Sequence, residues 1–333
     1  MSGIPNTRMN GLPTFTREQL VEYFNRTYQC QSDVGERKLN EIEQLVKSDP
    51  REALFSLQRR HLATFPFSNL VLHYSQHQSI SLDPDVLFHK MVERGLGGYC
   101  VENTGLLAIV LRTLGFKFYC GGARVSKNLV PGPENAKFTG FSHQVLIVTI
   151  KDVKYMVDVG FGPQGPTQPL VMNEGEPVLS GIAQMSLVRK QLSINTDPEQ
   201  RPWVYQFRKD PNSEWVMAYC FYEIEFISED YDLMNWWASK HPTSPFTQGF
   251  IFTKFTLNKA EDGIDGVLML LKNIVKRNHN GKAEILKTLR SEEERVAALK
   301  EFFDVHLQPM EIRGIRGKST EIAKAYESFG DSS

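Results

Sequence analysis

The stretch that decides the fold of this chain is residues 94–104, which read RGLGGYCVENT. Two adjacent glycines let the backbone approach its surroundings closely just before Cys100, and the apolar run at 105–114 predicts a helix immediately after it. Cys100 is therefore expected at or near a helix N-terminus. Unpaired N–H groups and the helix dipole favour an anion there, which shifts the thiol toward the nucleophilic thiolate. A free cysteine more often packs as a small hydrophobic residue. The other residues of the chain must therefore show whether Cys100 is a nucleophile or a core residue.

Composition and charge exclude several broad classes of function. The chain has 333 residues, of which 41% are hydrophobic, and its 38 basic and 39 acidic residues give a formal net charge of −1. This balance disfavours a nucleic-acid partner. No apolar run approaches the roughly eighteen residues of a membrane span, and residues 1–17 lack the order of a secretory signal. We therefore expect no association with a membrane.

Cysteine and histidine spacing gives no sign of a metal site. The cysteines are Cys30, Cys100, Cys120 and Cys220. They form no close pair, which indicates free thiols in a reducing, cytoplasmic location. His73 and His77 have helical ligand spacing but no third ligand, so we expect two solvent-facing histidines. The glycines before Cys100 do not match GxGxxG spacing, and no Walker-type loop occurs, which disfavours a nucleotide-binding role.

The hydrophobic pattern divides the chain into three parts, at 1–117, 118–228 and 229–333. The first part has the period of helices, which are expected at 16–24, at 38–46, from Pro50 and at 83–94. The second part alternates with a period of two, with strand candidates at 118–125, 143–150, 153–159, 184–189, 203–208 and 215–226. Short strands with such connections predict an antiparallel sheet that closes toward a barrel. The third part mixes a strand candidate at 250–256 with a capped helix at 291–305 and a polar, partly helical tail.

One hairpin of the second part carries two residues that suit acid–base chemistry. Lys151-Asp152 separates two β-branched runs, so residues whose numbers sum to about 303 face each other. His143 then pairs with about residue 160, and Asp158 shares the parity of that pairing. Both side chains should lie on one face, roughly 5–8 Å apart between their Cβ atoms. Taken singly, the histidine is more often an exposed polar residue and the aspartate a turn former.

These residues complete a catalytic set. A catalytic thiol needs a base that takes its proton, and an imidazole acting as this base needs a third group to fix its tautomer. Cys100, His143 and Asp158 are therefore candidates for nucleophile, base and orienting carboxylate. The order of the three residue types alone leaves a structural role for each of them equally open.

Several segments, taken together and in order, resemble the arylamine N-acetyltransferases. They are GGYCVEN at 97–103, His143 before an apolar strand, and YMVDVGFG at 155–162. The segment PFSNL at 66–70 is similar to the family's PFENL segment, and NWWASKHPTSPF at 235–246 looks like its later cofactor-side motif. The matches run from about residue 20 to about residue 305. The resemblance implies an α+β fold with an N-terminal helical bundle, an antiparallel β-barrel, a C-terminal α/β lid and a cysteine-protease-like Cys-His-Asp arrangement.

The resemblance also implies which residues meet the substrates. A coenzyme A thioester would be the acyl donor, with contacts from Thr139, Gly140, Trp237 and Thr243. An apolar slot for a flat aromatic amine would be lined by Phe67, Tyr99 and Phe161. The threonines are otherwise ordinary loop hydroxyls, and the three aromatic residues are nearly as well explained as plain core residues.

The implied activity is transfer of an acyl group from coenzyme A to an arylamine or hydrazine, by ping-pong kinetics through a cysteine thioester, as in xenobiotic detoxification. The resemblance leaves the donor open between acetyl- and malonyl-coenzyme A, because some fungal members of the family prefer malonyl donors. A malonyl carboxylate would need a cation such as Arg124 or Lys137. No metal and no obligate protein partner are implied. Two alternatives stay open: a Cys-His-Asp hydrolase or transglutaminase-like enzyme, and an inactive coenzyme A-binding or scaffold protein.

Three positions depart from the family pattern. Leu96 stands where the family usually has arginine, Ser68 where it usually has glutamate, and Thr104 where asparagine is frequent. If the first two positions normally form an ion pair, both partners are lost together here, which avoids a stranded buried charge. We therefore expect apolar side chains to pack around positions 68 and 96 in place of an ion pair, and we call this region the apolar floor of the active site.

Overall fold

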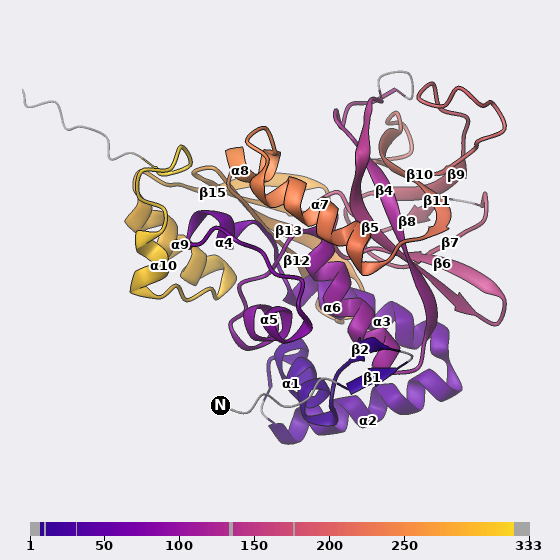
Figure 1. Cartoon of the computed structure of the whole chain (residues 1–333), viewed down its shortest axis with the longest axis horizontal. Coiled ribbons are helices and arrows are strands. Elements are labelled where there is room, and N and C mark those ends of the chain that lie inside the picture. The colour runs from indigo at the N-terminus through magenta and orange to yellow at the C-terminus, as the bar shows by residue number, and fades with distance from the viewer. Residues whose placement is uncertain (1–6, 10, 31, 133–135, 176, 323–333) are drawn as a thin grey trace, which may run out of the picture.

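The helices of the N-terminal part of the chain lie together at one side of the molecule, and two larger antiparallel sheets make up most of the rest (Figure 1). The computed structural model describes residues 7–9, 11–30, 32–132, 136–175 and 177–322. The predicted polar tail lies outside the described residues from position 323 onward, and residues 1–6 lie outside them as well.

The first part of the chain forms the predicted helical bundle. Its helices are α1 (Arg17–Tyr28), α2 (Ser32–Ser48), α3 (Pro50–Thr64), α4 (Leu70–His73), α5 (Pro84–Leu87), the π-helical segment η1 (Phe88–Glu93) and α6 (Cys100–Thr113). Thr16 caps α1, because its side chain accepts the N–H of Gln19. Leu20, Leu57 and Leu107 lie in one buried core that extends to the barrel. The hairpin of β1 (Thr7–Met9) and β2 (Leu12–Thr14) was not predicted.

The second part forms a nearly closed, eight-stranded antiparallel sheet. Its strands are β4 (Lys117–Ser126), β5 (Phe138–Ile150), β6 (Val153–Val157), β7 (Leu170–Val171), β8 (Val178–Leu179), β9 (Gln184–Arg189), β10 (Trp203–Arg208) and β11 (Val216–Glu225), in the order β7-β6-β5-β4-β11-β10-β9-β8. Leu170 on β7 and Met185 on β9 pack in the same core, so the two sides of the sheet approach each other. A glycine of β4 allows a close approach here, because the Phe226 ring occupies the space that a Cβ on Gly122 would need.

The hairpin of β5 and β6 has the register that the sequence predicts. Ile150 pairs with Val153, and Leu146 pairs with Val157, so the residue numbers of each pair sum to 303. The turn residues 151–152 both have positive φ, at 47° and 66°. This is the turn geometry that matches the twist of two adjacent strands.

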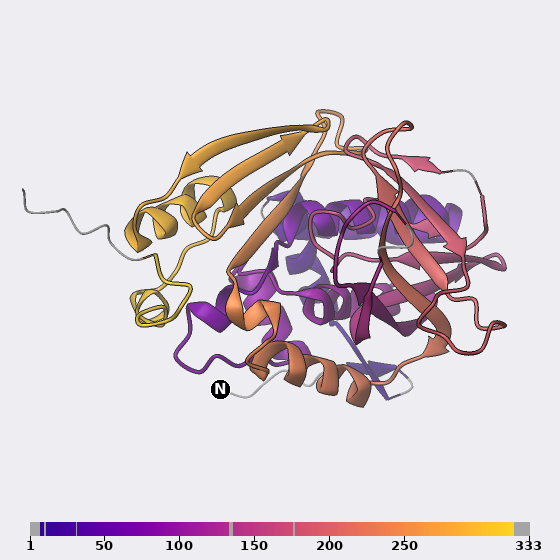
Figure 2. The same ribbon diagram turned by 90° about the horizontal axis from the view of Figure 1, so that it is seen from above.

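The third part forms a second sheet with helices beside it. Its elements are α7 (Ser228–Lys240), α8 (Pro245–Gln248), β12 (Ile251–Leu257), β13 (Ile264–Leu271), β14 (Ile274–His279), β15 (Lys282–Thr288), α9 (Glu292–Phe303) and α10 (Pro309–Arg313). The strand β3 (Phe67–Ser68) of the first part completes this sheet by pairing with β12. Figure 2 shows α7 on the side of the molecule opposite to the β12–β15 sheet. The chain thus crosses between parts, and the division at 117 and 228 stays a prediction. None of the helices in the described ranges is long and apolar enough to cross a membrane.

Candidate active site

Cys100 is the first residue of α6, as the glycine turn predicted. Tyr99 precedes the helix, and its N–H donates to Glu102 Oε2 at 3.1 Å, which caps the first turn. The cysteine is only 5% exposed, and its thiol donates to the Ser142 carbonyl oxygen at 3.6 Å. The sulfur therefore lies between a helix start and the strand residue next to His143.

His143 and Asp158 meet inside the barrel. Nε2 of His143 lies 2.8 Å from Oδ2 of Asp158, and both side chains are buried. Asp158 Oδ1 accepts the N–H of Gly160 at 2.8 Å, which fixes the carboxylate. The contact predicted from the hairpin register is thus present, and neither residue is an exposed or merely turn-forming one.

The electrostatics favour a charged imidazole at this position. Burial disfavours the imidazolium, but the adjacent Asp158 carboxylate and the Cys100 sulfur outweigh burial and raise the pKa of His143 to about 10. His143 is then protonated at neutral pH and can stabilise a thiolate beside it. Such a pair is the usual activated state of a nucleophilic cysteine.

Glycines allow the segments of this site to approach closely. Gly97 has a φ of 67°, and a Cβ there would lie 2.3 Å from the Pro66 carbonyl oxygen. A Cβ on Gly160 would lie 2.6 Å from the Cα of Cys100. A side chain at either position would push the cysteine turn away from its supports.

Aromatic residues surround the three polar groups. Phe161 contacts the His143 ring edge-to-face at a centroid distance of 5.4 Å. Tyr99 is fully buried and stacks on Phe246, 5.2 Å away, while Phe67 lies 6.0 Å from the same Phe246 ring. The three predicted pocket residues therefore lie around the triad. Their role in substrate binding stays a prediction.

Helix α7 covers the sulfur side of the site. Cys100 belongs to one apolar cluster with Tyr231 and Met234 of α7. The hydroxyl of Tyr99 donates to Asn235, also on α7, and Asn235 donates to the Ile80 carbonyl oxygen. This helix consequently supports the residues around the cysteine.

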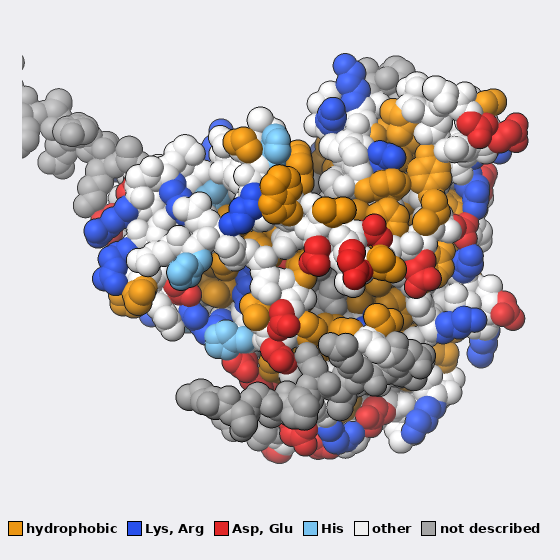
Figure 3. Space-filling model, in the orientation of Figure 1, with side chains coloured by type: hydrophobic (Ala, Val, Ile, Leu, Met, Phe, Trp, Pro, Cys, Tyr) orange, Lys and Arg blue, Asp and Glu red, His pale blue; other side chains and the backbone are white. Residues whose placement is uncertain are grey.

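The four predicted cofactor residues lie in two regions of the chain, at the start of β5 and from α7 to the loop after it. Thr139 and Gly140 begin β5, where Thr139 Oγ1 accepts the N–H of Val125 and Gly140 is exposed. Trp237 is 37% exposed and stacks on His241, whose Nδ1 also lies 2.9 Å from Thr243 Oγ1. The molecular surface is hollowed between α8 and the ends of β4 and β5 (Figure 3).

The departures from the family pattern fit an apolar floor. Leu96 is buried in a cluster with Leu70 and Phe252. Ser68 is buried as well, and its hydroxyl accepts the N–H of Leu70 at 2.9 Å. Thr104 Oγ1 lies 3.5 Å from the Gln144 carbonyl oxygen. No charge is therefore left without a partner at these three positions.

One expectation was wrong. His73 is buried rather than solvent-facing, because its two ring nitrogens contact a hydroxyl and two carbonyl oxygens. Nδ1 lies 2.8 Å from Thr320 Oγ1, and Nε2 lies 3.1 and 3.2 Å from the carbonyl oxygens of Phe246 and Gly249. The side-chain amide nitrogen of Asn69 lies 3.0 Å from the same Nε2. These contacts make His73 a structural support of α8.

Sequence reasoning also missed residues that support the triad. The amide of Gln58 on α3 donates to the carbonyl oxygens of Asp158 and Pro166, both at 3.1 Å. Tyr219 on β11 lies 5.0 Å from the His143 ring. These contacts link positions far apart in the chain, and no local spacing signals them.

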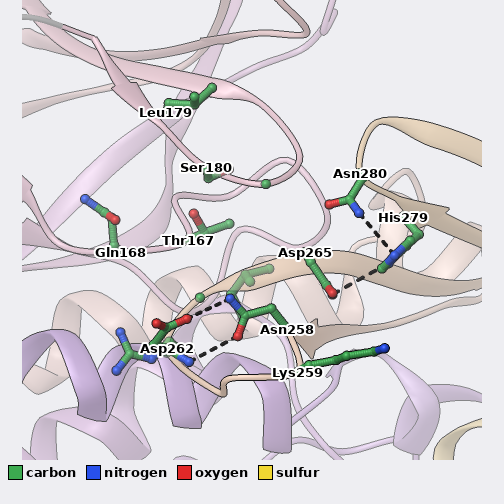
Figure 4. Close-up of a pocket in the computed structure, with 14 residues that line it drawn as sticks. Thr167, Gln168, Leu179, Ser180, Asn258, Lys259, Asp262, Asp265, His279 and Asn280 are labelled. Carbon is green, nitrogen blue, oxygen red and sulfur yellow. Dashed lines mark hydrogen bonds and ion pairs between the residues drawn. The ribbon is translucent and has the colours of Figure 1, made fainter.

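A separate polar cavity lies away from the triad. Its volume is about 680 Å³, and it is lined by residues of α3, of the β8–β9 turn and of the β12–β15 sheet (Figure 4). His279 and Asp265 pair across part of it at 3.7 Å. It contains none of the predicted site residues. No group of three or more metal-ligating side chains occurs in the part of the chain that the structure describes.

A cysteine at a helix start, a buried histidine–carboxylate pair and a barrel hairpin that joins them are typical of enzymes that carry an acyl group on sulfur. The site therefore has the arrangement of such an enzyme. A family model described as N-acetyltransferase matches residues 52–312. The chain therefore belongs to the arylamine N-acetyltransferase family, whose members are acyltransferases.

Individual relatives agree with this assignment. The chain is 34% identical over 310 residues to the N-malonyltransferase FDB2 of Gibberella moniliformis, which covers 88% of this chain and 90% of that protein. It is 30% identical over 232 residues to an arylamine N-acetyltransferase / N-hydroxyarylamine O-acetyltransferase of Salmonella typhimurium, covering 70% and 74%.

Solved structures share the fold. The Salmonella typhimurium arylamine N-acetyltransferase matches with a TM-score of 0.71 at 24% identity, over 90% of this chain and 98% of that chain. The Mycobacterium marinum enzyme in complex with CoA matches with a TM-score of 0.68 at 24% identity, over 89% and 98%. The α+β fold with a barrel-like sheet predicted from the sequence is thereby confirmed.

Proposed function

We propose that the protein transfers an acyl group from an acyl-coenzyme A thioester to the nitrogen of an aromatic amine or hydrazine, through a thioester on Cys100. The observation that carries this proposal is the position of Cys100 at the start of α6 beside the buried His143–Asp158 pair. Relatives support it, because FDB2 is an N-malonyltransferase and the Mycobacterium marinum structure is a complex with CoA.

The first half-reaction loads the enzyme. The Cys100 thiolate attacks the carbonyl carbon of the donor, and the bond from that carbon to the coenzyme A sulfur breaks. His143 gives its proton to the departing thiolate, so free coenzyme A leaves as a thiol. The Asp158 carboxylate keeps the imidazole oriented toward the sulfur throughout.

The second half-reaction unloads it. The uncharged nitrogen of an arylamine attacks the Cys100 thioester, and the carbon–sulfur bond breaks as the amide forms. His143 takes the proton that the nitrogen loses, which restores the thiolate–imidazolium pair. The buried, apolar surroundings of Cys100 keep water out, and this favours aminolysis over hydrolysis.

Thr139 and Gly140 on β5, together with Trp237 on α7 and Thr243 after it, are our candidates for contacts to coenzyme A. Their partial or full exposure supports that role. Phe67, Tyr99 and Phe161 are the candidates for the amine slot. The acyl group is acetyl or malonyl. The four free cysteines agree with a reducing, cytoplasmic location. We place the reaction in xenobiotic detoxification.

Incubation of the purified protein with acetyl- or malonyl-coenzyme A, followed by intact mass and peptide mapping, tests the proposal. We expect one acyl group on Cys100, which transfers to an added arylamine, and none on Cys100→Ser. A protein that only hydrolyses the donor, with no amide formed, would be the hydrolase alternative. A protein that binds coenzyme A but never becomes acylated would be the inactive binding protein.

A further inference from the structure

A buried ion pair lies at the start of the helix that carries Cys100, and the reaction proposed above does not use it. Glu102 on α6 is fully buried, and its Oε1 lies 2.5 Å from Nζ of Lys90 on η1, whose side chain is only 12% exposed. Oε2 of the same carboxyl group accepts the N–H of Tyr99. Both oxygens therefore act as acceptors, as in an ionised carboxylate.

Lys90 joins η1 to both ends of the cysteine turn. Its carbonyl oxygen accepts the N–H of Leu96 at 3.1 Å, and its ammonium group reaches Glu102 at the other end. The segment η1 is itself anchored, because Met91 lies in the core of the helical bundle. A Cβ on Gly98 would lie 3.0 Å from Glu102 Oε2, so the carboxylate lies against the glycine turn.

A carboxylate at this end of α6 conflicts with the ionisation of the cysteine. The N–H groups and the dipole at the start of the helix favour the Cys100 thiolate. A full negative charge on Glu102 outweighs the roughly half positive charge of a helix end. Burial also raises the pKa of Glu102, and the Lys90 ammonium opposes this rise. The ammonium thus cancels the added negative charge and leaves the cap of the helix intact.

The other titratable groups near the sulfur do not provide this neutralisation. His143 faces the sulfur from β5, but Asp158 already pairs with it. Tyr99, Tyr231 and Cys120 lie in the apolar cluster around the sulfur, and burial raises the pKa of each, so all three are uncharged at neutral pH. The balance of charge at the helix end therefore depends on the ion pair between η1 and α6.

We propose that Lys90 is a positioning residue for the nucleophile: it neutralises Glu102, so that this carboxylate caps α6 without opposing the Cys100 thiolate. This role rests on the nucleophilic cysteine proposed above. Loss of the ammonium alone should disfavour the thiolate, and loss of the carboxylate alone should favour it. Loss of both should leave it nearly unchanged. A purely structural pair would instead give two single variants that change in the same direction.

Alkylation of Cys100 by iodoacetamide, followed by peptide mass mapping over the pH range in which the protein stays folded, tests the proposal. We expect the pH midpoint of alkylation to rise by about one pH unit in Lys90→Met and to fall by a smaller amount in Glu102→Gln. The double variant Lys90→Met/Glu102→Gln should return close to the wild-type midpoint. Glu102→Gln and the double variant contain no unpaired buried carboxylate, so they test the proposal even if Lys90→Met does not fold.

Arg94→Met is the matched control. Arg94 directly follows η1 and pairs with Glu311 on α10 at 3.1 Å, so this variant removes a neighbouring cation that does not pair with α6. It should keep the wild-type midpoint. Midpoints that shift in the same direction in both single variants, or in neither, would overturn the proposal. Failure of an acyl donor to acylate wild-type Cys100 would refute the proposed function, and the alkylation midpoints would still decide the role of Lys90.

Discussion

The Cα of Cys100 lies 2.6 Å from the point that a Cβ on Gly160 would occupy. This approach brings the start of α6 against the segment that follows Asp158, and so it sets the position of the sulfur relative to the imidazole. A methyl group at position 160 has to displace one of the two segments. We expect Gly160→Ala to slow acylation of Cys100 by about 100-fold and to lower the free energy of unfolding by about 1–3 kcal/mol.

Single-turnover acylation and urea denaturation measure these two effects. Gly105→Ala on the same helix is the matched control, because a Cβ there meets only a Leu87 methyl group at 3.8 Å. Alanine is also the better helix former, so this variant should be neutral or slightly more stable. Similar acylation rates in the two variants would show that the close approach does not position the sulfur.

The raised pKa of His143 predicts a pH-dependent stability. Burial opposes the charge but Asp158 outweighs it, so the folded protein holds this proton up to about pH 10 while the unfolded chain releases it near pH 6.5. The stabilisation is therefore complete below pH 6.5 and is lost as the pH rises toward 10. The difference in free energy of unfolding between wild type and Asp158→Asn should be largest near pH 6 and shrink toward pH 10. A difference that grows with pH would contradict a charged His143 in the folded state.

Local sequence patterns were enough to predict two separate parts of the candidate site, although not that these parts meet. A glycine turn before an apolar run marked the helix start at Cys100, and strand parity around Lys151-Asp152 placed His143 and Asp158 on one face. The buried state of His73 could not be predicted in this way. Its partners are Phe246, Gly249 and Thr320, which local periodicity does not connect to it.

The same limit applies to the second sheet. Strands β13 to β15 were not predicted, because their sequences carry charged residues on an exposed face and a glycine at 266. The short strand β3 forms by pairing with β12, which lies far along the chain. Elements that depend on distant partners leave a weak local signal.

The apolar floor around Leu96 predicts that the usual arginine of the family is not tolerated at this position alone. Leu96 is buried in a cluster of apolar residues, and position 68 offers a hydroxyl instead of a carboxylate. Leu96→Arg should lower the free energy of unfolding by about 3 kcal/mol, because it buries an unpaired charge. The double variant Leu96→Arg/Ser68→Glu should recover part of that loss.

Urea denaturation of the single and double variants measures both effects. Leu179→Arg is the control for introducing an arginine as such, because Leu179 is 71% exposed, and it should be nearly neutral. A Leu96→Arg variant that is more stable than the wild type would refute the apolar floor.

The buried His73 predicts a distant effect on donor binding. Its Nε2 and the side-chain amide of Asn69 contact the carbonyl oxygen of Phe246, within α8, and that of Gly249, directly after α8. The same α8 follows Thr243, one of the proposed coenzyme A contacts, and Phe246 stacks on Tyr99 beside the sulfur. Loss of the imidazole leaves a buried carbonyl oxygen with fewer donors and loosens α8.

We therefore expect His73→Ala to raise KM for the acyl donor by about tenfold, the effect of roughly one lost hydrogen bond, with a smaller change in the rate of the acyl-transfer step. Steady-state kinetics with varied donor concentration separates the two quantities. His77→Ala is the matched control, because that side chain is exposed four residues further along, and it should behave as the wild type. A fall in kcat with unchanged KM would place the role of His73 in the triad itself, and equal behaviour of the two variants would show that α8 is held without it.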